Sequence, residues 1–460
     1  MYQVGLWLRL SATAVAVIVL SACSGQFGNA QDLGTAVPSP TSTSTTPETA
    51  PTTDEPIEIV VWGEYFTYDA MSQDPENAGK YGLYLKEQFE KEHPGVTVNI
   101  EYHGWDETLR QNLFNALLAG TAPDIVVGEN YFQNFAELGA LVPLDDIIGD
   151  IEADLIPGTY KAAEYNGRIY GLSAFTGVFG FERNCAVIEA AGLNCDQPPQ
   201  TWDDLLSEAR QITSQGNGEY YGFTLQGPSE SSSVGGIFRT AVFLAQASAP
   251  MCQDNCTYPY FNNPQAIPVM KFLRNIYGYT PPGLAFNPHE GQVYEQLFLG
   301  LSAYQVAGSW HPEWARTTGC QDCRYSPVPI PEGGQQASVI VGNVIYAVLT
   351  QSKHPELAAE WVKFVAREDV QEKVYPALGR LPSTYSALRK LRPTVSAAEQ
   401  AFIDQLLETP NLEILPQWRK EPQMLWQIYN DMLTKILTTS RPVEDIMNEA
   451  QQAAEEVMAQ

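Results

Sequence analysis

Short apolar runs alternate with stretches of helical periodicity along most of the chain. The run Ile57–Trp62 predicts a buried strand, and residues 96–102 alternate apolar with polar side chains, which predicts a second strand. Between them, residues 83–92 predict a helix that ends before Pro94. The alternation continues as a helix at 109–117, a strand at 123–127 and a helix at 132–138. Strands interleaved with helices predict βα units and a largely parallel sheet.

Further helices are predicted in the rest of the chain. Thr201 and Asp204 have the spacing of a capping box, in which each side chain satisfies a free amide at the start of a helix. A helix that begins at Pro355 carries Trp361 and Phe364 on one face, and we expect both rings in the core. Two long amphipathic helices are predicted near the end, at residues 424–436 and 446–457. The fold class is therefore α/β.

The first residues of the chain do not follow this pattern. Arg9 precedes the uncharged apolar run Leu10–Leu20, which is too short to span a bilayer and has the length of the apolar segment of a signal peptide. The sequence Leu-Ser-Ala-Cys at 20–23 resembles the bacterial lipobox, in which a lipidated cysteine becomes the mature N-terminus. We expect a signal peptide at residues 1–22 and a lipid on Cys23. The alternative is an ordinary signal peptide with an incidental cysteine.

A segment rich in small polar residues and proline follows. Residues 35–56 hold eleven Ser or Thr and five Pro. Such a composition cannot bury enough apolar surface to offset the entropy lost on ordering, so residues 23–56 predict a disordered linker. The protein is thus expected to be exported and anchored on the outer face of the cell membrane through Cys23 alone.

The charge balance narrows the classes of partner. The 460 residues carry 26 Lys plus Arg against 54 Asp plus Glu, and the formal net charge is −28. Only four of the acidic residues precede residue 57, so the body itself is acidic. This excludes binding to nucleic acid, which requires basic patches. About 400 residues beyond the linker exceed what one core accommodates, so we expect two lobes.

Six cysteines besides Cys23 fall into three close pairs, Cys185/Cys195, Cys252/Cys256 and Cys320/Cys323. Outside the cytoplasm, the simplest interpretation is a disulfide within each pair. Two alternatives stay open at this point. Residues 320–323 form a Cys-x-x-Cys that could be redox-active, and the last two pairs could together hold zinc. We predict neither a metal nor a cofactor.

The sequence lacks recognisable catalytic signatures. It has no Gly-x-Ser-x-Gly, no His-Glu-x-x-His and no phosphate-binding loop. Its carboxylates are so numerous that a glycosidase-like acid and base pair stays open as an alternative. We therefore predict a binding protein that is not an enzyme.

Aromatic and acidic residues gather where predicted strands end, which is where open α/β sheets form ligand crevices. An aromatic face stacks on the C–H face of a sugar ring, while carboxylates and amides form hydrogen bonds with its hydroxyls. For each single aromatic residue, the alternative is a place in the core. The candidate ligand-binding residues of this kind are Trp62, Gly63, Glu64, Tyr65, Glu129, Asn130, Phe175, Trp310 and Trp314.

From about residue 57 to the C-terminus, the order of segments resembles the bacterial extracellular solute-binding proteins of ABC importers, in the maltose-binding-protein-like group. The segments include Phe-Glu-Lys-Glu-His-Pro-Gly-Val-Thr-Val at 89–98, Tyr-Asn-Gly-Arg-Ile-Tyr-Gly-Leu at 165–172, Ala-Gly-Ser-Trp at 307–310 and Leu-Gly-Arg-Leu-Pro at 378–382. The three cysteine pairs depart from this group. The cleft positions of the family match Gly63, Glu64, Glu129, Phe175, Trp310 and, more loosely, Asn343. Either Trp418 or Trp426 would supply a stacking ring.

The resemblance implies a periplasmic-binding-protein-like fold of type II, in which a hinge connects two lobes. Lobe 1 would comprise residues 57–173 and 335–380, and lobe 2 residues 174–334 and 381–460. The crossings would lie near Ser173–Gly177, Gly333–Ala337 and Gly379–Ser383.

The implied function is the capture of a solute, foremost a mono- or oligosaccharide, between the lobes of a monomer, followed by delivery to the membrane subunits of an ABC permease. Three alternatives stay open. The solute could be a non-sugar such as a polyamine, the receiver could be a sensor, or the protein could be a lipid-anchored glycoside-active enzyme.

Overall fold

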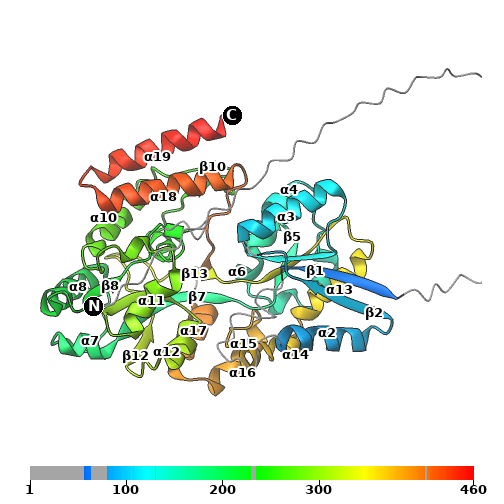
Figure 1. The fold of residues 1–460 in the computed structure, drawn as a ribbon, viewed down its shortest axis with the longest axis horizontal. Helices are drawn as coiled ribbons and strands as arrows, with labels where there is room; N and C mark the ends of the chain where they lie inside the picture. The colour runs from blue at the N-terminus through cyan, green and yellow to red at the C-terminus, as the bar shows by residue number, and fades with distance from the viewer. Residues whose placement is uncertain are drawn as a thin grey trace, which may run out of the picture. The chain divides into compact units, whose positions relative to one another are not determined.

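The computed structural model describes residues 56–63, 80–104, 106–129, 131–228, 235–409 and 412–459. Residues 54–460 form one compact unit. Within it, two β-sheets each carry their own helices, which gives the two lobes (Figure 1). The predicted signal peptide, Cys23 and the linker up to residue 55 lie outside the described residues. Among the described helices, none has both the length and the apolar character needed to cross a membrane.

The sheet of the first lobe has the strand order β2-β1-β3-β14-β6. Its strands are β1 (Ile57–Trp62), β2 (Val96–Glu101), β3 (Ile125–Gly128), β6 (Gly171–Ser173) and β14 (Ile345–Val348). The first three run parallel to one another, as the sequence predicts. Strand β14 is antiparallel to both of its neighbours, β3 and β6. It enters the sheet from a distant part of the chain, so the local βα alternation does not set its direction.

Helices cover both faces of this sheet, because successive side chains of a strand point to opposite sides. Val61 and Val127 pack in one core with α2 and α13, and Trp361 of α13 is buried there as predicted. Val126 and Ile345 pack in another core with α3 and α4. These helices are α2 (Lys80–Glu92), α3 (Asp106–Ala119), α4 (Phe132–Glu137) and α13 (Pro355–Val365).

The sheet of the second lobe has the strand order β15-β13-β7-β11-β8, and β12 pairs with the second half of β7. Strands β8 and β11 are parallel, whereas β7 is antiparallel to β11 and β13. Its strands are β7 (Gly177–Asn184), β8 (Tyr221–Thr224), β11 (Ser302–Gly308), β12 (Cys323–Ser326), β13 (Ser338–Val341) and β15 (Leu412–Glu413).

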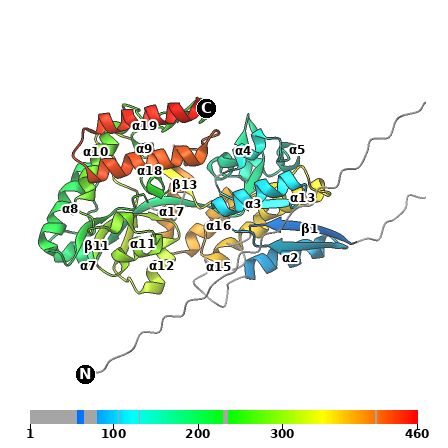
Figure 2. The ribbon, with the colours of Figure 1, turned by 45° about the horizontal axis from the view of Figure 1, so that its top comes forward.

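One core of the second lobe joins this sheet to α8, α10, α18 and α19, and a second core joins it to α17. Helices α18 and α19 lie side by side near the C-terminus (Figures 1 and 2). Helix α8 opens with the predicted capping box, in which Thr201 Oγ1 accepts from the backbone N of Asp204 at 3.1 Å and Asp204 Oδ2 accepts from the backbone N of Thr201 at 3.0 Å. These helices are α8 (Trp202–Gly216), α10 (Ala266–Tyr277), α17 (Ala397–Glu408), α18 (Pro422–Thr438) and α19 (Val443–Met458).

Shorter elements complete the two lobes. The helices are α5 (Asp145–Ile148), α6 (Pro157–Tyr160), α7 (Cys185–Ala190), α9 (Ala241–Gln246), α11 (Glu290–Phe298), α12 (His311–Thr318), α14 (Glu368–Gln371), α15 (Val374–Leu378) and α16 (Tyr385–Leu391). Two small hairpins are formed by β4 (Glu164–Tyr165) with β5 (Arg168–Ile169), and by β9 (Cys252–Gln253) with β10 (Tyr258–Pro259).

Three segments of the chain pass between the lobes and are hydrogen-bonded to one another. The backbone N of Ala174 donates to the carbonyl of Val344 at 2.8 Å, and the backbone N of Thr176 donates to the carbonyl of Leu381 at 2.8 Å. The second passage lies at residues 342–344, and the prediction of Gly333–Ala337 is wrong because β13 already belongs to the second sheet. These three paired segments form the hinge.

All three predicted disulfides are present, namely Cys185–Cys195, Cys252–Cys256 and Cys320–Cys323. The sulfurs of the last two pairs are bonded to each other, as in the disulfide interpretation, and not arranged as in the zinc alternative. Each bond closes a short loop within the second lobe.

Candidate functional site

Glu129 follows β3 and connects the end of this strand to the hinge. Its Oε1 accepts a hydrogen bond from the backbone N of Gly342 at 2.7 Å. Strand β3 belongs to the first lobe and Gly342 follows β13 of the second, so this bond joins a predicted cleft residue to the second crossing. The carboxylate of Glu129 also acts on Arg380, a cation of the third crossing that is 6 % exposed. Burial lowers the pKa of Arg380 to about 9, and the charge of Glu129 opposes that shift, so Arg380 stays charged at neutral pH.

Trp310, just after β11, packs in a slot that is formed in part by the backbone of three glycines. A Cβ added at Gly308 would lie 2.4 Å from its ring, and one at Gly177 or Gly342 would lie 3.0 or 3.2 Å away. Glycine at these positions therefore leaves the room that the ring occupies. The guanidinium carbon of Arg380 lies 5.1 Å from the ring centre, within cation–π range. Trp310 is 7 % exposed, so in this conformation most of its surface contacts the protein itself.

Two more predicted residues lie at the crossings. The side chain of Asn343 is buried, and its Oδ1 accepts from Thr176 Oγ1 of the first crossing at 2.5 Å. Phe175 is buried in a core of the first lobe, while its backbone carbonyl accepts from the N of Val344 at 3.3 Å. The structure thus brings Glu129, Phe175, Trp310 and Asn343 together around the hinge.

Trp62 and Gly63 lie at the end of β1, where the nearest partners come from β2. The indole N of Trp62 donates to Glu101 Oε2 at 3.0 Å, and its ring stacks on His103 with centres 3.8 Å apart. Hydrogen bonds from His103 and then Trp62 hold the pKa of Glu101 below its usual value. Gly63 has φ of +100°, and a Cβ there would meet Leu109 at 2.5 Å, so this position requires glycine.

The remaining predicted tryptophans pack within the second lobe. Trp314 stacks on Tyr294 with ring centres 5.5 Å apart and also lies 6.5 Å from Trp310. Trp418 and Trp426 are both buried and meet edge to face at 4.3 Å in the core that α18 and α19 share. Glu64, Tyr65 and Asn130 lie outside the described residues.

A buried polar network beside Trp310 was not predicted. His311 Nδ1 lies 2.7 Å from Glu182 Oε2, and His311 Nε2 lies 3.0 Å from Arg239 Nη2. Because a guanidinium only donates, Nε2 must accept and Nδ1 must carry the proton that goes to Glu182. Burial lowers the pKa of His311 to about 4, so the ring is neutral at pH 7.

The hydroxyl of Tyr325 donates to the other oxygen of Glu182 at 2.5 Å. Burial, and then the charge of Glu182, raise the pKa of Tyr325. The network fixes the start of α12 and therefore the segment that carries Trp310. One signal in the sequence was a glutamate and an arginine, Glu182 and Arg183, side by side in the otherwise apolar run of β7.

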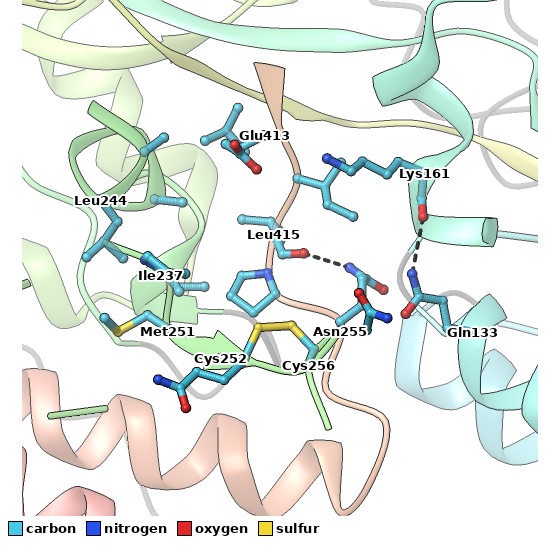
Figure 3. A pocket seen from close by; sticks show the side chains of 18 of the residues that line it. Gln133, Lys161, Ile237, Leu244, Met251, Cys252, Asn255, Cys256, Glu413 and Leu415 are labelled. Carbon is cyan, nitrogen blue, oxygen red and sulfur yellow. Dashed lines mark hydrogen bonds between the residues drawn. A yellow bond between two sulfur atoms is a disulfide. The ribbon is translucent and has the colours of Figure 1, made fainter. Parts of the chain in front are cut away.

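A separate pocket of about 600 Å³ lies between the two lobes. Gln133 and Lys161 line it from the first lobe, Met251 and the Cys252–Cys256 disulfide line it from the second, and a segment around Leu415 runs between them (Figure 3). No predicted ligand-binding residue is among the described residues that line this pocket. The pocket and the cluster around Trp310 both lie in the interlobe region, since Gln133 of the pocket follows β3 as Glu129 does.

Comparison with known proteins decides the family. The family description "bacterial extracellular solute-binding protein" matches residues 73–372, which is more than half of the chain. The chain belongs to the bacterial extracellular solute-binding proteins.

Curated relatives of this solute-binding protein share about a quarter of its residues. A binding protein of Brucella abortus (strain 2308) is 25% identical over 347 residues, which cover 74% of this chain and 82% of the relative. The arabinooligosaccharide-binding protein of Bacillus subtilis (strain 168) is 25% identical over 64% of this chain and 68% of its own. The maltodextrin-binding protein of the same strain is 23% identical over 73% of this chain and 78% of its own.

Solved structures agree on the fold. The cyclic alpha-maltosyl-1,6-maltose binding protein from Arthrobacter globiformis superposes with a TM-score of 0.73 at 19% identity, over 88% of this chain and 99% of that chain. A sugar-binding protein from Xanthomonas citri gives a TM-score of 0.72 at 19% identity, over 87% of this chain and 97% of that chain. The predicted two-lobed fold of the maltose-binding-protein-like group is confirmed.

Proposed function

We propose that this solute-binding protein is the capture component of an ABC importer and that its solute is a mono- or oligosaccharide. The observation that carries the proposal is the hinge, where Gly342 donates to Glu129 of one lobe and also lies against the ring of Trp310 of the other. Three paired crossings let two lobes rotate about a common axis while the chain stays continuous. A cleft that closes over a solute needs such a joint.

The sugar class is supported by chemistry and by relatives. Bacillus subtilis relatives are named for arabinooligosaccharide and for maltodextrin. The ends of β1 and β3, which carry Trp62, Gly63 and Glu129, offer an indole and a carboxylate of the kinds that sugar rings and hydroxyls need. We propose a binding cleft at these strand ends that includes Trp62, Glu64, Glu129 and Trp310.

Closure of the two lobes over the solute is the step that captures it for the importer. A solute can shift the hinge only as far as it makes contacts in the closed form that the open form lacks. Glu129 already connects β3 to the second crossing, so a hydroxyl that competes for this carboxylate would change the same contact that spans the hinge. The closed, loaded form is then the species that a permease would recognise.

The cellular setting is part of the same proposal. We propose an N-terminal signal peptide at residues 1–22, and a lipid on Cys23 with a flexible linker to residue 56 that together hold a monomer at the outer face of the cell membrane near its permease. We also propose the lobe boundaries 57–173 with 335–380 and 174–334 with 381–460, except that Ser338–Val341 pairs in the second sheet. A tether of this kind raises the effective concentration at the permease.

A thermal-shift screen tests the sugar class. The purified protein is heated with maltotriose, arabinotriose or diacetylchitobiose, and in parallel with spermidine. A bound sugar at 100 times its dissociation constant is expected to stabilise the folded state by about 2.7 kcal/mol. After incubation with the protein, each oligosaccharide is also analysed by chromatography to measure whether it has been shortened.

Three results separate the alternatives. A shift with spermidine and with none of the sugars would contradict a carbohydrate ligand. Shortened oligosaccharides after incubation would point to the glycoside-active alternative instead. A sugar shift without turnover supports the proposed function.

A further inference from the structure

The polar cluster beside Trp310 contains a titratable group that the proposed function does not use. His311, Glu182 and Arg239 are all buried, so water screens little of the interaction among them. The imidazole lies between the two charged side chains, with Nδ1 2.7 Å from Glu182 Oε2 and Nε2 3.0 Å from Arg239 Nη2. One negative and one positive charge compensate each other in this cluster only while His311 is neutral.

The geometry around His311 suits one protonation state. The neutral ring donates from Nδ1 and accepts at Nε2, which satisfies both neighbours. A proton on Nε2 would turn this acceptor into a donor that faces the guanidinium of Arg239, which can only donate. Two cations would then lie side by side in a buried site, where their repulsion is much stronger than in water. Protonation of His311 and its contact with Arg239 therefore exclude each other.

The other groups around the imidazole do not compensate an added proton. Glu182 already accepts from Gln305 at 2.7 Å and from Tyr325 at 2.5 Å, in addition to the imidazole. Arg380 brings a second positive charge, which opposes protonation as the first does. The charged and titratable groups around His311 are Glu182 on β7, Tyr325 on β12, Tyr294 on α11, Arg239 before α9 and Arg380 at the third crossing.

Each partner of the contact is the chain neighbour of an aromatic ring. Trp310 precedes His311, and Phe238 precedes Arg239. The centres of these two rings lie 6.4 Å apart, with an angle of 30° between their planes. Ile237, the next residue toward the N-terminus, lines the pocket between the lobes. The contact of His311 with Arg239 therefore holds together the two segments that carry these rings.

We propose that the contact between His311 and Arg239 is a pH-sensitive switch, which opens when His311 takes up a proton and then releases Trp310 from its slot at the hinge. The imidazole and the indole are carried by consecutive residues at the start of α12, so repulsion of one displaces the other. Protonation of a buried histidine is a known way to shift a contact between two arrangements. Burial lowers the pKa of His311 to about 4, so the switch opens in acid.

The consequence for solute binding rests on the proposed function, in which Trp310 belongs to the cleft. Only the molecules in which the switch is closed present Trp310 in its slot, and the apparent affinity falls in proportion to their fraction. At the pH where half of the molecules carry the proton, the affinity is about twofold lower. The protein would hold its solute at neutral pH and release part of it in acid.

Fluorine NMR of the protein labelled with fluorotryptophan tests the switch without any solute. The Trp310 resonance is identified by its absence from Trp310→Phe and is followed from pH 7 to pH 3. We expect it to shift with a midpoint near pH 4, while the resonance of Trp361, which is buried in the first lobe, stays in place. His311→Gln should abolish the shift. His289→Gln, which changes an exposed histidine, should keep it.

The wild type decides the outcome even where His311→Gln does not fold. Proton NMR of the His311 ring gives the midpoint of its titration, and the Trp310 resonance should share that midpoint. A Trp310 resonance that stays in place while His311 titrates overturns the switch. Joint movement of the Trp310 and Trp361 resonances would show unfolding in place of a local release and also overturns it, as does an unchanged Trp310 shift in His311→Gln.

Titration with maltotriose at pH 7 and pH 4 distinguishes the switch from the proposed function. We expect about twofold weaker binding at pH 4 for the wild type and a smaller change for His311→Gln. Equal affinities at the two pH values would overturn the effect of the switch on solute binding. Absence of maltotriose binding at both pH values, with the Trp310 transition intact, would count against the sugar class and leave the switch standing.

Discussion

The ring of Trp310 lies against glycines from three different strands or crossings, and the close approach of backbone is what encloses it. Gly308 makes the tightest of these contacts, since a Cβ there would lie 2.4 Å from the ring. The slot leaves space for no additional methyl group, because protein interiors are packed at crystal-like density. A side chain larger than that of glycine at position 308 would therefore disturb the packing of Trp310 at the hinge between the lobes.

Gly308→Ala is expected to destabilise the protein by about 1–3 kcal/mol, because the new methyl group must displace the Trp310 ring or the strand. Urea unfolding followed by circular dichroism measures the change. Gly291→Ala is the matched control, since Gly291 is exposed in α11 with no atom within 4 Å of an added Cβ. It should be neutral or stabilise by up to about 1 kcal/mol. Equal stability of the two variants would contradict the packing described here.

Protonation of His311 gives a prediction for pH. Its folded-state pKa of about 4 lies below the value of about 6.5 expected when unfolded. Between these values the unfolded chain binds a proton that the folded protein does not, so stability present above about pH 6.5 falls toward pH 4. Complete loss of the His311 contribution lowers the free energy of unfolding by about 3 kcal/mol.

Urea midpoints at pH 7, 6, 5 and 4 measure this effect. His311→Gln should reduce the slope of unfolding free energy against pH in this window, whatever its effect at pH 7. His289→Gln changes an exposed histidine and should keep the wild-type slope. Identical slopes for wild type and His311→Gln would show that His311 titrates normally in the folded protein.

At the scale of elements, caps and amphipathic faces account for most helices. Helix α8 is the clearest case, because the capping box of Thr201 and Asp204 satisfies two free amides at its start. The hydrogen bond to Thr201 holds the pKa of Asp204 below its usual value. Helix α8 packs against β8, so its start helps to set the edge of the second sheet.

Thr201→Ala is expected to lower the free energy of unfolding by about 1 kcal/mol, since the amide of Asp204 loses its side-chain acceptor. Thermal and urea unfolding both report the loss. Ser214→Ala, in the exposed last turns of the same helix, should be neutral or slightly stabilising because alanine has the higher helix propensity. A loss of similar size in both variants would argue against a specific role for the cap.

At the scale of the whole molecule, the hinge is the part on which function depends. Three crossings carry hydrogen bonds between them, and Glu129 adds a bond from β3 to the second crossing. The guanidinium of Arg380 lies over the Trp310 ring of the second lobe and interacts electrostatically with the carboxylate of Glu129 in the first. This one carboxylate therefore influences both lobes. Removing that charge should affect stability and closure together.

Glu129→Gln is expected to destabilise the protein by about 1–3 kcal/mol and to weaken solute binding, because Gly342 loses a charged acceptor and the buried Arg380 loses a nearby anion. Small-angle scattering with and without the solute should show a smaller decrease in the radius of gyration than for the wild type. Glu137→Gln, an exposed carboxylate of α4, is the control. Wild-type affinity and closure in Glu129→Gln would place the function of the hinge elsewhere.

The sequence predicted local structure well and long-range pairing less well. The strand at Ile57–Trp62, the capping box and the burial of Trp361 follow from neighbouring residues, because periodicity and capping act over one or two turns. The antiparallel entry of β14 and the place of β13 in the second sheet did not follow. The partners of β14 in the first sheet, and β7 as the partner of β13, lie more than a hundred positions away along the chain, and no local pattern encodes such a partner.

The features of the candidate site also separate into those that the local sequence predicted and those that depend on distant parts of the chain. By itself the sequence determined that an acidic, two-lobed α/β protein carries Glu129 and Trp310 after strand ends, and that its cysteines pair at short range. Only the tertiary structure decided that Arg380 covers Trp310, that His311 is neutral, and that a pocket of about 600 Å³ opens between the lobes. Burial and electrostatic environment are set by distant segments packed together, whereas hydrophobic pattern and spacing belong to the chain alone.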